Sequence, residues 1–432
     1  MTSSLHRSMG WAATWMTPRR LRQLWYVPLL VLAMGLMLAR LLAVARVLDL
    51  TGFAAFSGGL LVSGTFCMLG CLGLQALLQR EWPMQLVRGR ERHGPIRAAQ
   101  CSLVALTCAV TGLIVAVSGV SPGGMTPGLL AVGALHGLSQ QFFLVATVES
   151  RSRGDMLRFS LQNLVRAIVA MVASVLVAWS TGSAILALAA DALLSMALSV
   201  RFFAVSLALA GQQASAIYAL AWRRLRAVPW RSALQLSGVI AVGFALLNAD
   251  RWVASSQFSA TGFAQYAFAW TVLSTAQSAQ GVINAAVYPM LSRRFGSAGR
   301  EETFALCLKV SLAVMVIGGV LAFPLVWGLA WSIRRWYAPY ADAIVVLPIF
   351  LAVAVLRASD FWSSFMLISG FEGRLLRLNL VAALLGSLIW VVGIQLGAGP
   401  SESLTQVAWL AAALTICNHA FVGWAAWMER RA

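Results

Sequence analysis

The chain has 432 residues, of which 60% are apolar and only 11% are charged. A soluble domain is roughly 25% charged, so most of the surface of this protein is expected to face lipid. The formal charge of +18 does not indicate a nucleic-acid-binding protein, because the basic residues lie in short clusters between long apolar runs rather than on one soluble face.

Twelve apolar runs follow one another along the chain, each long enough to cross a membrane. A spanning helix needs about 20 mostly apolar residues, because the hydrocarbon core is roughly 30 Å thick. The predicted spans are 24–47, 53–78, 97–120, 127–149, 157–180 and 183–207, then 232–254, 262–290, 303–331, 342–368, 377–398 and 403–427. We therefore predict an all-α polytopic membrane protein with two six-helix bundles. Its parts are an N-terminal segment (1–23), a first bundle (24–210), a basic linker (211–231) and a second bundle (232–432).

Arginine is distributed unevenly over the connections between these spans. Alternate connections hold 23 Arg on one side, whereas the other side holds Arg334 and Arg335, or four with Arg46 and Arg251 at helix ends. Cytoplasmic loops of membrane proteins carry such an excess of basic residues. The pattern predicts a multi-pass membrane protein with both termini in the cytoplasm. The connections are short, so the function is expected to lie among the helices.

A short sequence recurs at the start of the second span of each half. Thr51–Phe56 reads Thr-Gly-Phe-Ala-Ala-Phe, and Thr261–Tyr266, 210 residues later, reads Thr-Gly-Phe-Ala-Gln-Tyr. An Arg near the end of the preceding span comes before each segment, Arg46 in one half and Arg251 in the other. Six helices per half give both halves the same orientation. This predicts a pseudo-two-fold axis along the membrane normal and a central cavity between the halves, with the substrate site near the midplane.

The same stretches resemble a known family. Ala45–Leu48 followed by Phe53–Phe56 is similar to the Ala-Arg-x-Leu-Gly…Phe-Gly-x-Tyr opening of bacterial polysaccharide flippases, and Gly73–Glu81 is similar to the end of their second helix. In the second half, Asp250–Tyr266 and Pro289–Arg293 resemble the corresponding segment of helices 7 and 8. The resemblance implies the multidrug/oligosaccharidyl-lipid/polysaccharide exporter superfamily, with two six-helix bundles around a central cavity.

Two positions depart from the pattern of this family. Asp49 stands where Gly is usual after Leu48, and Ala54 also replaces Gly. The first departure is expected to alter the outer turn between helices 1 and 2.

Charged side chains deep in a span cost about 2.5–3.5 kcal/mol on insertion scales, so they normally face a cavity or a partner. Arg40 in helix 1 and Arg166 in helix 5 have no acidic residue within four positions on their own helices. Gln162 and Asn163 precede Arg166 by four and three residues, and therefore share its helical face. We predict that these four residues bind the substrate.

Amide and imidazole side chains form two further polar stripes. His136 and Gln140 lie four residues apart in helix 4, and Gln277, Gln280 and Asn284 follow one face of helix 8. The simpler interpretation is hydrogen bonding between helices, worth about 0.6 kcal/mol per bond. Gln280 and Asn284 remain candidates for binding the substrate.

The other intramembrane charges have two interpretations each. Arg357 and Asp360 are three residues apart in helix 10, so they either pair with each other or face the cavity. Asp191 in helix 6 is expected to pair with an Arg of another helix that the sequence does not identify. Asp191, Asp250 and Asp360 are the candidates for coupling transport to an ion.

Four basic residues lie nearer the membrane interfaces. Arg46 and Arg251 either anchor their helices or line the outward mouth of the cavity, and with Arg357 they complete the candidate substrate-binding arginines. Arg201 and Lys309 lie within reach of the cytoplasmic interface and are expected to extend toward it.

The excess of deep Arg over deep acid favours an anionic ligand, because guanidinium is suited to bidentate recognition of phosphate oxygens. The sequence has no Ser/His/Asp, paired-carboxylate or metal-ligand grouping, and no Gly-x-x-x-x-Gly-Lys loop. We therefore predict a non-enzyme without cofactor or metal, for which ATP is not the direct energy source.

Together with the resemblance, these features favour a flippase that moves an undecaprenyl-pyrophosphate-linked oligosaccharide from the cytoplasmic to the periplasmic leaflet by alternating access. This glycan would be used to assemble O-antigen, capsule or exopolysaccharide. Expected partners are the lipid-linked glycan, membrane lipids, a polysaccharide polymerase and glycosyltransferases, with no nucleic acid.

Three alternatives remain open. A cation- or proton-coupled multidrug exporter of the same superfamily is disfavoured by Arg40 in helix 1 but kept open by Asp250 in helix 7. A lipid II flippase usually has two additional helices. A membrane-embedded glycan polymerase or ligase usually has a long periplasmic loop, whereas the longest outward connection here, Trp331–Tyr340, is short.

Overall fold

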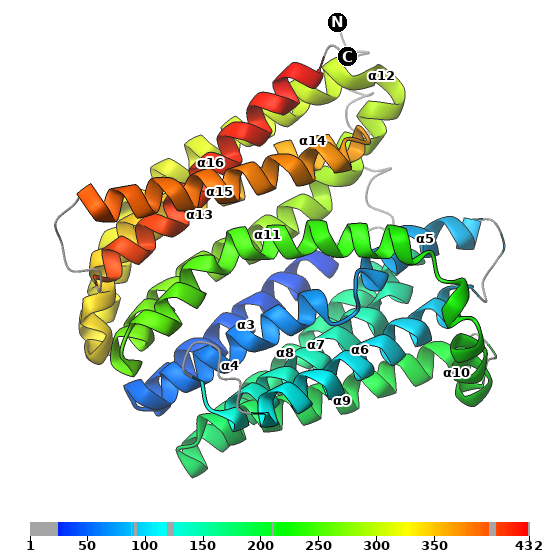
Figure 1. The fold of residues 1–432 in the computed structure, drawn as a ribbon, viewed down its shortest axis with the longest axis horizontal. Helices are drawn as coiled ribbons and strands as arrows, with labels where there is room; N and C mark the ends of the chain where they lie inside the picture. The colour runs from blue at the N-terminus through cyan, green and yellow to red at the C-terminus, as the bar shows by residue number, and fades with distance from the viewer. Residues whose placement is uncertain are drawn as a thin grey trace, which may run out of the picture.

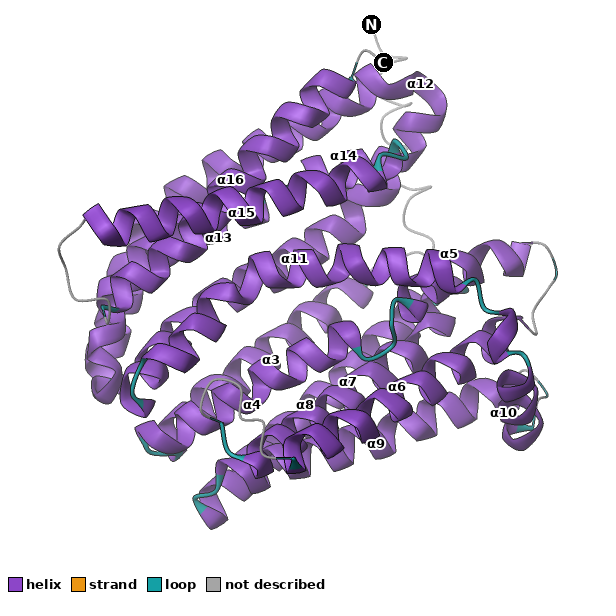
Figure 2. Cartoon of the chain, viewed as in Figure 1, coloured by secondary structure: helices purple, strands orange, loops and turns teal. Residues whose placement is uncertain are grey.

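The computed structural model describes residues 25–87, 89, 93–118, 125–209, 211, 213–396 and 403–430. Within these ranges the chain consists of helices joined by short connections, with no β-strand (Figure 2). The prediction of an all-α protein is confirmed. The predicted N-terminal segment, 1–23, lies outside the described residues.

The first half of the chain forms seven helices. They are α3 (Tyr26–Val47), α4 (Leu50–Leu69), α5 (Leu74–Val87), α6 (His93–Val117), α7 (Pro127–Ser152), α8 (Met156–Thr181) and α9 (Ala184–Leu209). A short helix, α10 (Ala214–Arg223), and one 3-10 turn, Leu225–Ala227, lie in the basic linker.

The second half has the same general order. Its elements are α11 (Trp230–Gln257), α12 (Ala260–Trp336), the 3-10 helix η3 (Ala338–Val346), α13 (Leu347–Ala358), α14 (Trp362–Ile368), α15 (Glu372–Leu396) and α16 (Leu404–Glu429).

Eleven segments of the described chain are long and apolar enough to cross a membrane, which confirms a polytopic membrane protein. The eighth predicted span, 262–290, forms the first part of α12 but is not among the eleven. Many of its side chains lie outside those that the structure describes.

The structure corrects the second predicted span, which does not continue as one helix into α5. Leu72 and Gly73 adopt positive φ angles of 47° and 78° and separate α4 from α5. Gly73 also packs closely on α11, because a Cβ at this position would lie 1.9 Å from the carbonyl oxygen of Ala233. Only glycine allows both this conformation and this approach.

The predicted helices 8, 9 and 10 differ from the structure as well. Helices 8 and 9 join into α12, which bends at Gly299 (φ 78°, ψ −169°). The predicted span 342–368 is broken into η3, α13 and α14, with an interruption at Ser359–Phe361. Broken helices at membrane depth occur where the chain lines a cavity or lies inside protein, since the freed backbone groups need partners. This interruption lies beside Arg357.

The repeated sequence begins with a turn that Asp49 organises. Leu48 is extended (φ −83°, ψ 152°) and ends α3. The carboxylate of Asp49 then caps α4 by accepting the N–H of Gly52 at 2.8 Å and the hydroxyl of Thr51 at 2.6 Å. These hydrogen bonds hold the pKa of Asp49 below its usual value. Asp49 therefore forms an ordered helix cap at the position where the family usually has Gly.

The second half repeats this geometry. Phe258 ends α11 with nearly the same backbone angles (φ −88°, ψ 152°) as the residue 210 positions earlier. Ser259 caps α12 by accepting the N–H of Gly262 at 3.2 Å, and its hydroxyl lies 3.0 Å from that of Thr261. The sequence repeat therefore corresponds to a repeated local structure, as expected for two related halves.

The helices form two bundles that are joined at one end (Figure 1). Helices α3 to α9 form the first bundle, α12 to α16 form the second, and α11 lies between them. The bundles diverge toward the end that carries α5, α10 and the bend of α12, which we call the basic end. They converge at the end that carries the two capped turns, which we call the opposite end.

Aromatic side chains of both bundles close the opposite end. The ring of Phe53 in α4 contacts those of Tyr340 and Phe268, with centroids 5.4 Å and 6.3 Å away. The hydroxyl of Tyr340 donates to the carbonyl oxygen of Ala45 at 3.0 Å. These residues belong to one buried apolar cluster that draws side chains from both halves. We call this group the opposite-end seal.

Topology can be tested with reporter fusions in the connections. If the basic end is cytoplasmic, fusions at Arg90, Arg224 and Arg294 should report cytoplasm, and fusions at Pro122 and Gly399 should report periplasm. Alkaline phosphatase and a fluorescent protein provide complementary readouts. A periplasmic signal at Arg224 would contradict the arrangement of six helices followed by six.

Candidate functional site

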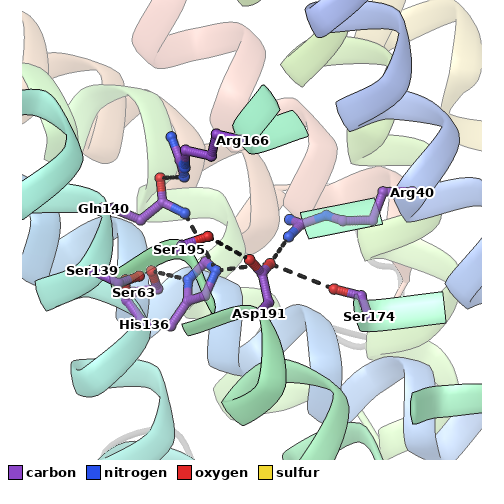
Figure 3. Close-up of polar contacts among 9 residues, drawn as sticks. All are labelled: Arg40, Ser63, His136, Ser139, Gln140, Arg166, Ser174, Asp191 and Ser195. Atoms are coloured by element: carbon purple, nitrogen blue, oxygen red, sulfur yellow. Dashed lines mark hydrogen bonds and ion pairs between the residues drawn. The ribbon is translucent and has the colours of Figure 1, made fainter. Parts of the chain in front are cut away.

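A network of buried polar side chains lies inside the first bundle (Figure 3). Its members come from five helices and surround one carboxylate, and we call them the first-bundle cluster. They are Arg40 (α3), Ser63 (α4), His136, Ser139 and Gln140 (α7), Arg166 and Ser174 (α8), and Asp191 and Ser195 (α9).

Asp191 is the centre of this cluster and has no exposed surface. It forms an ion pair with Arg40, so Arg40 is the partner that the sequence did not identify. Its other contacts are with the imidazole of His136 at 3.1 Å and the hydroxyls of Ser195 at 2.9 Å and Ser174 at 3.5 Å. A buried carboxylate is tolerated only when such partners replace water, so Asp191 is well compensated.

The contacts of His136 define its tautomer. An ionised carboxylate can only accept, so Nε2 of His136 carries the hydrogen that faces Asp191. In the neutral ring Nδ1 is then an acceptor, and the hydroxyl of Ser63 donates to it at 2.7 Å. His136 therefore joins α4, α7 and α9.

Arg166 belongs to the same cluster but has no acidic partner among the described ion pairs. Its guanidinium donates to Oε1 of Gln140, lies 4.4 Å from the centre of the Phe143 ring, and leaves Nε without a partner. The amide nitrogen of Gln140 lies 3.3 Å from Nε2 of His136. Arg166 is only 9% exposed, so it is a buried cation that lacks a counter-ion of its own.

The charges of the first-bundle cluster do not cancel. Arg40 and Arg166 are both cationic, Asp191 is the single anion, and His136 is neutral in the tautomer described above. The cluster therefore carries a net charge of about +1, located at Arg166. This arrangement is suited to a negatively charged ligand.

The structure separates the predicted polar stripe of α8. The side-chain oxygen of Gln162 accepts the hydroxyl of Ser150 at 2.9 Å, and the amide of Asn163 donates to the carbonyl of Phe159 on its own helix at 2.8 Å. Only Arg166 of the predicted three reaches the first-bundle cluster. Substrate binding by Gln162 and Asn163 remains a prediction.

The second bundle has a buried carboxylate of its own. Asp250 of α11 is fully buried and accepts the hydroxyl of Tyr266 at 2.7 Å. Its other oxygen has no hydrogen-bond partner among the described residues. Arg357 and Arg251 lie within electrostatic range of this carboxylate.

Arg357 does not form the predicted ion pair with Asp360. Its guanidinium donates to the hydroxyl of Thr415 at 3.1 Å and to the carbonyl of Leu247 at 3.2 Å. Asp360 instead accepts the backbone N–H and the hydroxyl of Ser363 at 3.3 Å and 2.8 Å. The helix ends at Ala358, so the two side chains do not share a continuous helical face.

A cavity of about 180 Å³ lies beside this helix break. Arg357, Asp360, Gln280, Asn379 and Asn418 contribute to its wall. The side-chain oxygens of Asn379 and Asn418 are buried without a described partner, and such groups normally need one. The cavity is therefore suited to a small polar ligand. The predicted Asn284 has a side chain outside those described.

The candidates at the opposite end are not equivalent, contrary to the prediction from the repeat. Arg46 is exposed and borders a 590 Å³ pocket with Thr261 and Trp336 of the second bundle. Arg251 is buried, stacks on Trp270 at 4.0 Å, and donates to the carbonyl of Ser57 at 3.3 Å. Arg251 therefore links α11 to α4 as part of the closed end.

The 210-residue offset relates a different pair of charges. Leu48 corresponds to Phe258 and Asp49 to Ser259 in the two capped turns, so the same offset relates Arg40 to Asp250. Equivalent positions in the two halves thus carry opposite charges, each buried in a polar network. The sequence pattern of an Arg followed by a turn related Arg46 to Arg251 instead.

No group of three or more His, Cys, Asp or Glu that could hold a metal occurs among the described residues. The clusters offer cationic and hydrogen-bonding side chains to a guest. Ser63, His136 and Asp191 form a hydrogen-bonded chain, but all three are buried and the carboxylate is paired with Arg40.

Comparisons with known proteins give fold information only. No protein-family profile and no curated sequence matches the chain. An inward-facing multidrug resistance MATE family transporter of the MOP superfamily is similar in structure, with a TM-score of 0.63 and 17% identity over 93% of this chain and 94% of that one. The chain has the fold of a MATE transporter.

Two more MATE-fold structures bear on this result. A MOP superfamily transporter from Pyrococcus furiosus gives a TM-score of 0.61 at 16% identity, over 96% of this chain and 97% of that one. An outward-facing MATE transporter gives only 0.54 at 16% identity, over 94% and 92%. These similar structures are transporters rather than enzymes, and at such identities they do not identify a substrate.

Proposed function

We propose that this protein exports an anionic lipid-linked oligosaccharide across the bacterial inner membrane, by alternating access between its two bundles. The substrate class is an undecaprenyl-pyrophosphate-linked glycan, loaded from the cytoplasmic leaflet at the basic end and released at the opposite end. The observation that carries this proposal is the uncompensated charge of Arg166. A pyrophosphate would supply the anion that this guanidinium lacks, through charge-assisted hydrogen bonds.

The fold alone does not choose between cationic and anionic substrates. The Pyrococcus furiosus transporter is described as having a binding pocket of reversed polarity that suggests a different function. The same fold therefore accommodates pockets of different charge, and the charge of the site has to decide. In this chain the buried site has an excess of Arg, which supports an anion.

The conformation supports the direction of loading. The opposite-end seal closes the space between the bundles at one end, and the bundles diverge at the basic end. If the basic end is cytoplasmic, this state receives substrate from the inside. Export then requires the seal to open, which would break the hydrogen bond from Tyr340 to Ala45.

Cation-coupled multidrug export is the second candidate. The structural similarity to multidrug MATE transporters favours it, and Asp250 supplies a buried carboxylate with one oxygen free of hydrogen bonds. In this alternative Asp250, Asp360 or Asp191 would bind the coupling ion. Asp191 is already paired with Arg40, so Asp250 is the better candidate of the three.

Depletion of the protein in its own host distinguishes the two candidates. Loss of a flippase should leave lipid-linked oligosaccharide on the cytoplasmic face, where glycosidase reaches it in inverted vesicles but not in spheroplasts. Surface polysaccharide should fall, and sensitivity to cationic dyes should stay unchanged. Normal surface polysaccharide combined with increased dye sensitivity would contradict this proposal and support multidrug export instead.

A further inference from the structure

The lipid-facing surface of the first bundle contains a groove between α8 and α9. It measures about 450 Å³ and combines charged, polar and apolar side chains. They are Asp155, Leu157, Arg158, Leu161, Gln162, Val165, Arg201, Phe202 and Val205. The groove lies outside the first-bundle cluster and is independent of the proposed transport function.

Arg201 is the unusual member of this groove. It is exposed on α9, and no ion pair or hydrogen bond joins it to another described residue. It precedes the last residue of the helix, Leu209, by eight positions, which is about 12 Å along the axis. The side chain therefore starts about two helical turns before the end of the span and has to extend toward the interface, where its charge can meet a lipid headgroup.

Neither acidic residue near Arg201 forms an ion pair with it among the described residues. Glu149 accepts both Arg153 at 2.6 Å and Arg158 at 2.9 Å. Asp155, which also lines the groove, caps α8 through the N–H of Arg158 at 3.1 Å. With the half-buried Arg151, four Arg and two acids occupy this end of α7 to α9, a net charge of about +2. Arg201 therefore has no acidic partner in the described part of the chain.

Next to its charged residues, the groove has an apolar wall. Leu161 and Val165 follow Arg158 by one and two turns of α8, and they are 44% and 39% exposed. Val205 on α9, 45% exposed, faces the same groove. A charged site that continues into exposed apolar surface matches a lipid with a phosphate headgroup. A free phosphate ion would leave this wall unused.

We propose that this groove binds an anionic phospholipid from the leaflet at the basic end. The phosphate lies between Arg158 and Arg201, and an acyl chain follows Leu161 and Val165. Basic pockets between helices on the cytoplasmic side of membrane proteins are suited to such headgroups. The surplus positive charge selects an anionic lipid over a zwitterionic one.

Native mass spectrometry of the full chain in detergent tests this site with phosphatidylglycerol as the probe. Arg201→Gln should weaken phosphatidylglycerol binding about tenfold, because a charge-assisted contact is lost. Arg201→Lys should retain most of the binding. Arg377→Gln is the matched control, since Arg377 is exposed on α15 and its one hydrogen bond among the described residues is to the carbonyl of Gly373, and it should leave binding unchanged.

Three results would overturn the proposal. Binding of phosphatidylglycerol by Arg201→Gln as tight as by the wild type would remove Arg201 from the site. Equal affinity of the wild type for phosphatidylcholine would show that anionic charge is not recognised. Competition by glycerol phosphate, which has no acyl chains, would indicate an ion site rather than a lipid site.

Discussion

Replacing Arg166 with alanine is expected to reduce transport at least tenfold while the protein stays folded in the membrane. Arg166 is a buried cation without an acidic partner among the described ion pairs, so its removal leaves no counter-ion unpaired. The lost interaction with a phosphate group is a charge-assisted hydrogen bond, worth about 1.5–3 kcal/mol. Arg166→Lys should recover part of the activity, because an ammonium keeps the charge but not the bidentate geometry.

Accessibility of lipid-linked oligosaccharide to glycosidase in inverted vesicles and spheroplasts measures the effect of each variant. Protein level and elution profile in size-exclusion chromatography confirm folding. Arg377→Ala is the control, because Arg377 is exposed on α15 outside the cluster, and its transport should be nearly normal. Full transport by Arg166→Ala would assign this residue a purely structural role and remove the main support for an anionic substrate.

The general fold follows from simple patterns in the sequence. Hydropathy predicts the segments that become membrane-length helices, because a spanning helix must hide its backbone from lipid. The recurrence of Thr-Gly-Phe at Thr51 and Thr261 predicts two related halves, and the structure shows a capped turn at each of these positions. Arg166 stands out already as a cation without a local acid, and the structure brings it into a buried polar cluster.

Other features of the site depend on distances that a sequence does not contain. Arg40 and Asp191 are 151 positions apart, so their ion pair has no local signal. The break of the tenth span contains no Gly or Pro, only Ser359, Asp360 and Phe361, and hydropathy continues across it. The assumption of a regular helix therefore left a pairing of Arg357 with Asp360 open as one of two interpretations, and in the structure the two side chains do not pair.

The relation between the halves also required the structure. The positions of Arg46 and Arg251 near helix ends suggested an equivalence, but burial of one and exposure of the other separate them. The capped turns relate Arg40 to Asp250 instead. Because equivalent positions carry opposite charges, the two bundles present different groups to a substrate that moves past them. The first bundle surrounds Asp191 with Arg40 and Arg166, whereas the second bundle places Arg251 and Arg357 near Asp250.

Replacing Asp191 with asparagine is expected to destabilise the protein by about 3–5 kcal/mol. This is the usual cost of removing one partner from a buried ion pair, because the remaining charge stays buried without compensation. Arg40 is only 3% exposed and has no other acid among its described ion pairs. The midpoint of thermal unfolding in detergent, followed by intrinsic tryptophan fluorescence, should fall clearly below that of the wild type.

The double variant Arg40→Met with Asp191→Asn separates stability from function. Removing both charges eliminates the buried unpaired Arg, so the unfolding midpoint should return most of the way to the wild-type value. If Arg40 also binds the substrate, this stable double variant should still transport poorly. Wild-type transport by the double variant would show that Arg40 serves only the ion pair. A single Asp191→Asn variant as stable as the wild type would contradict the ion pair itself, because an uncompensated guanidinium in this position should be costly.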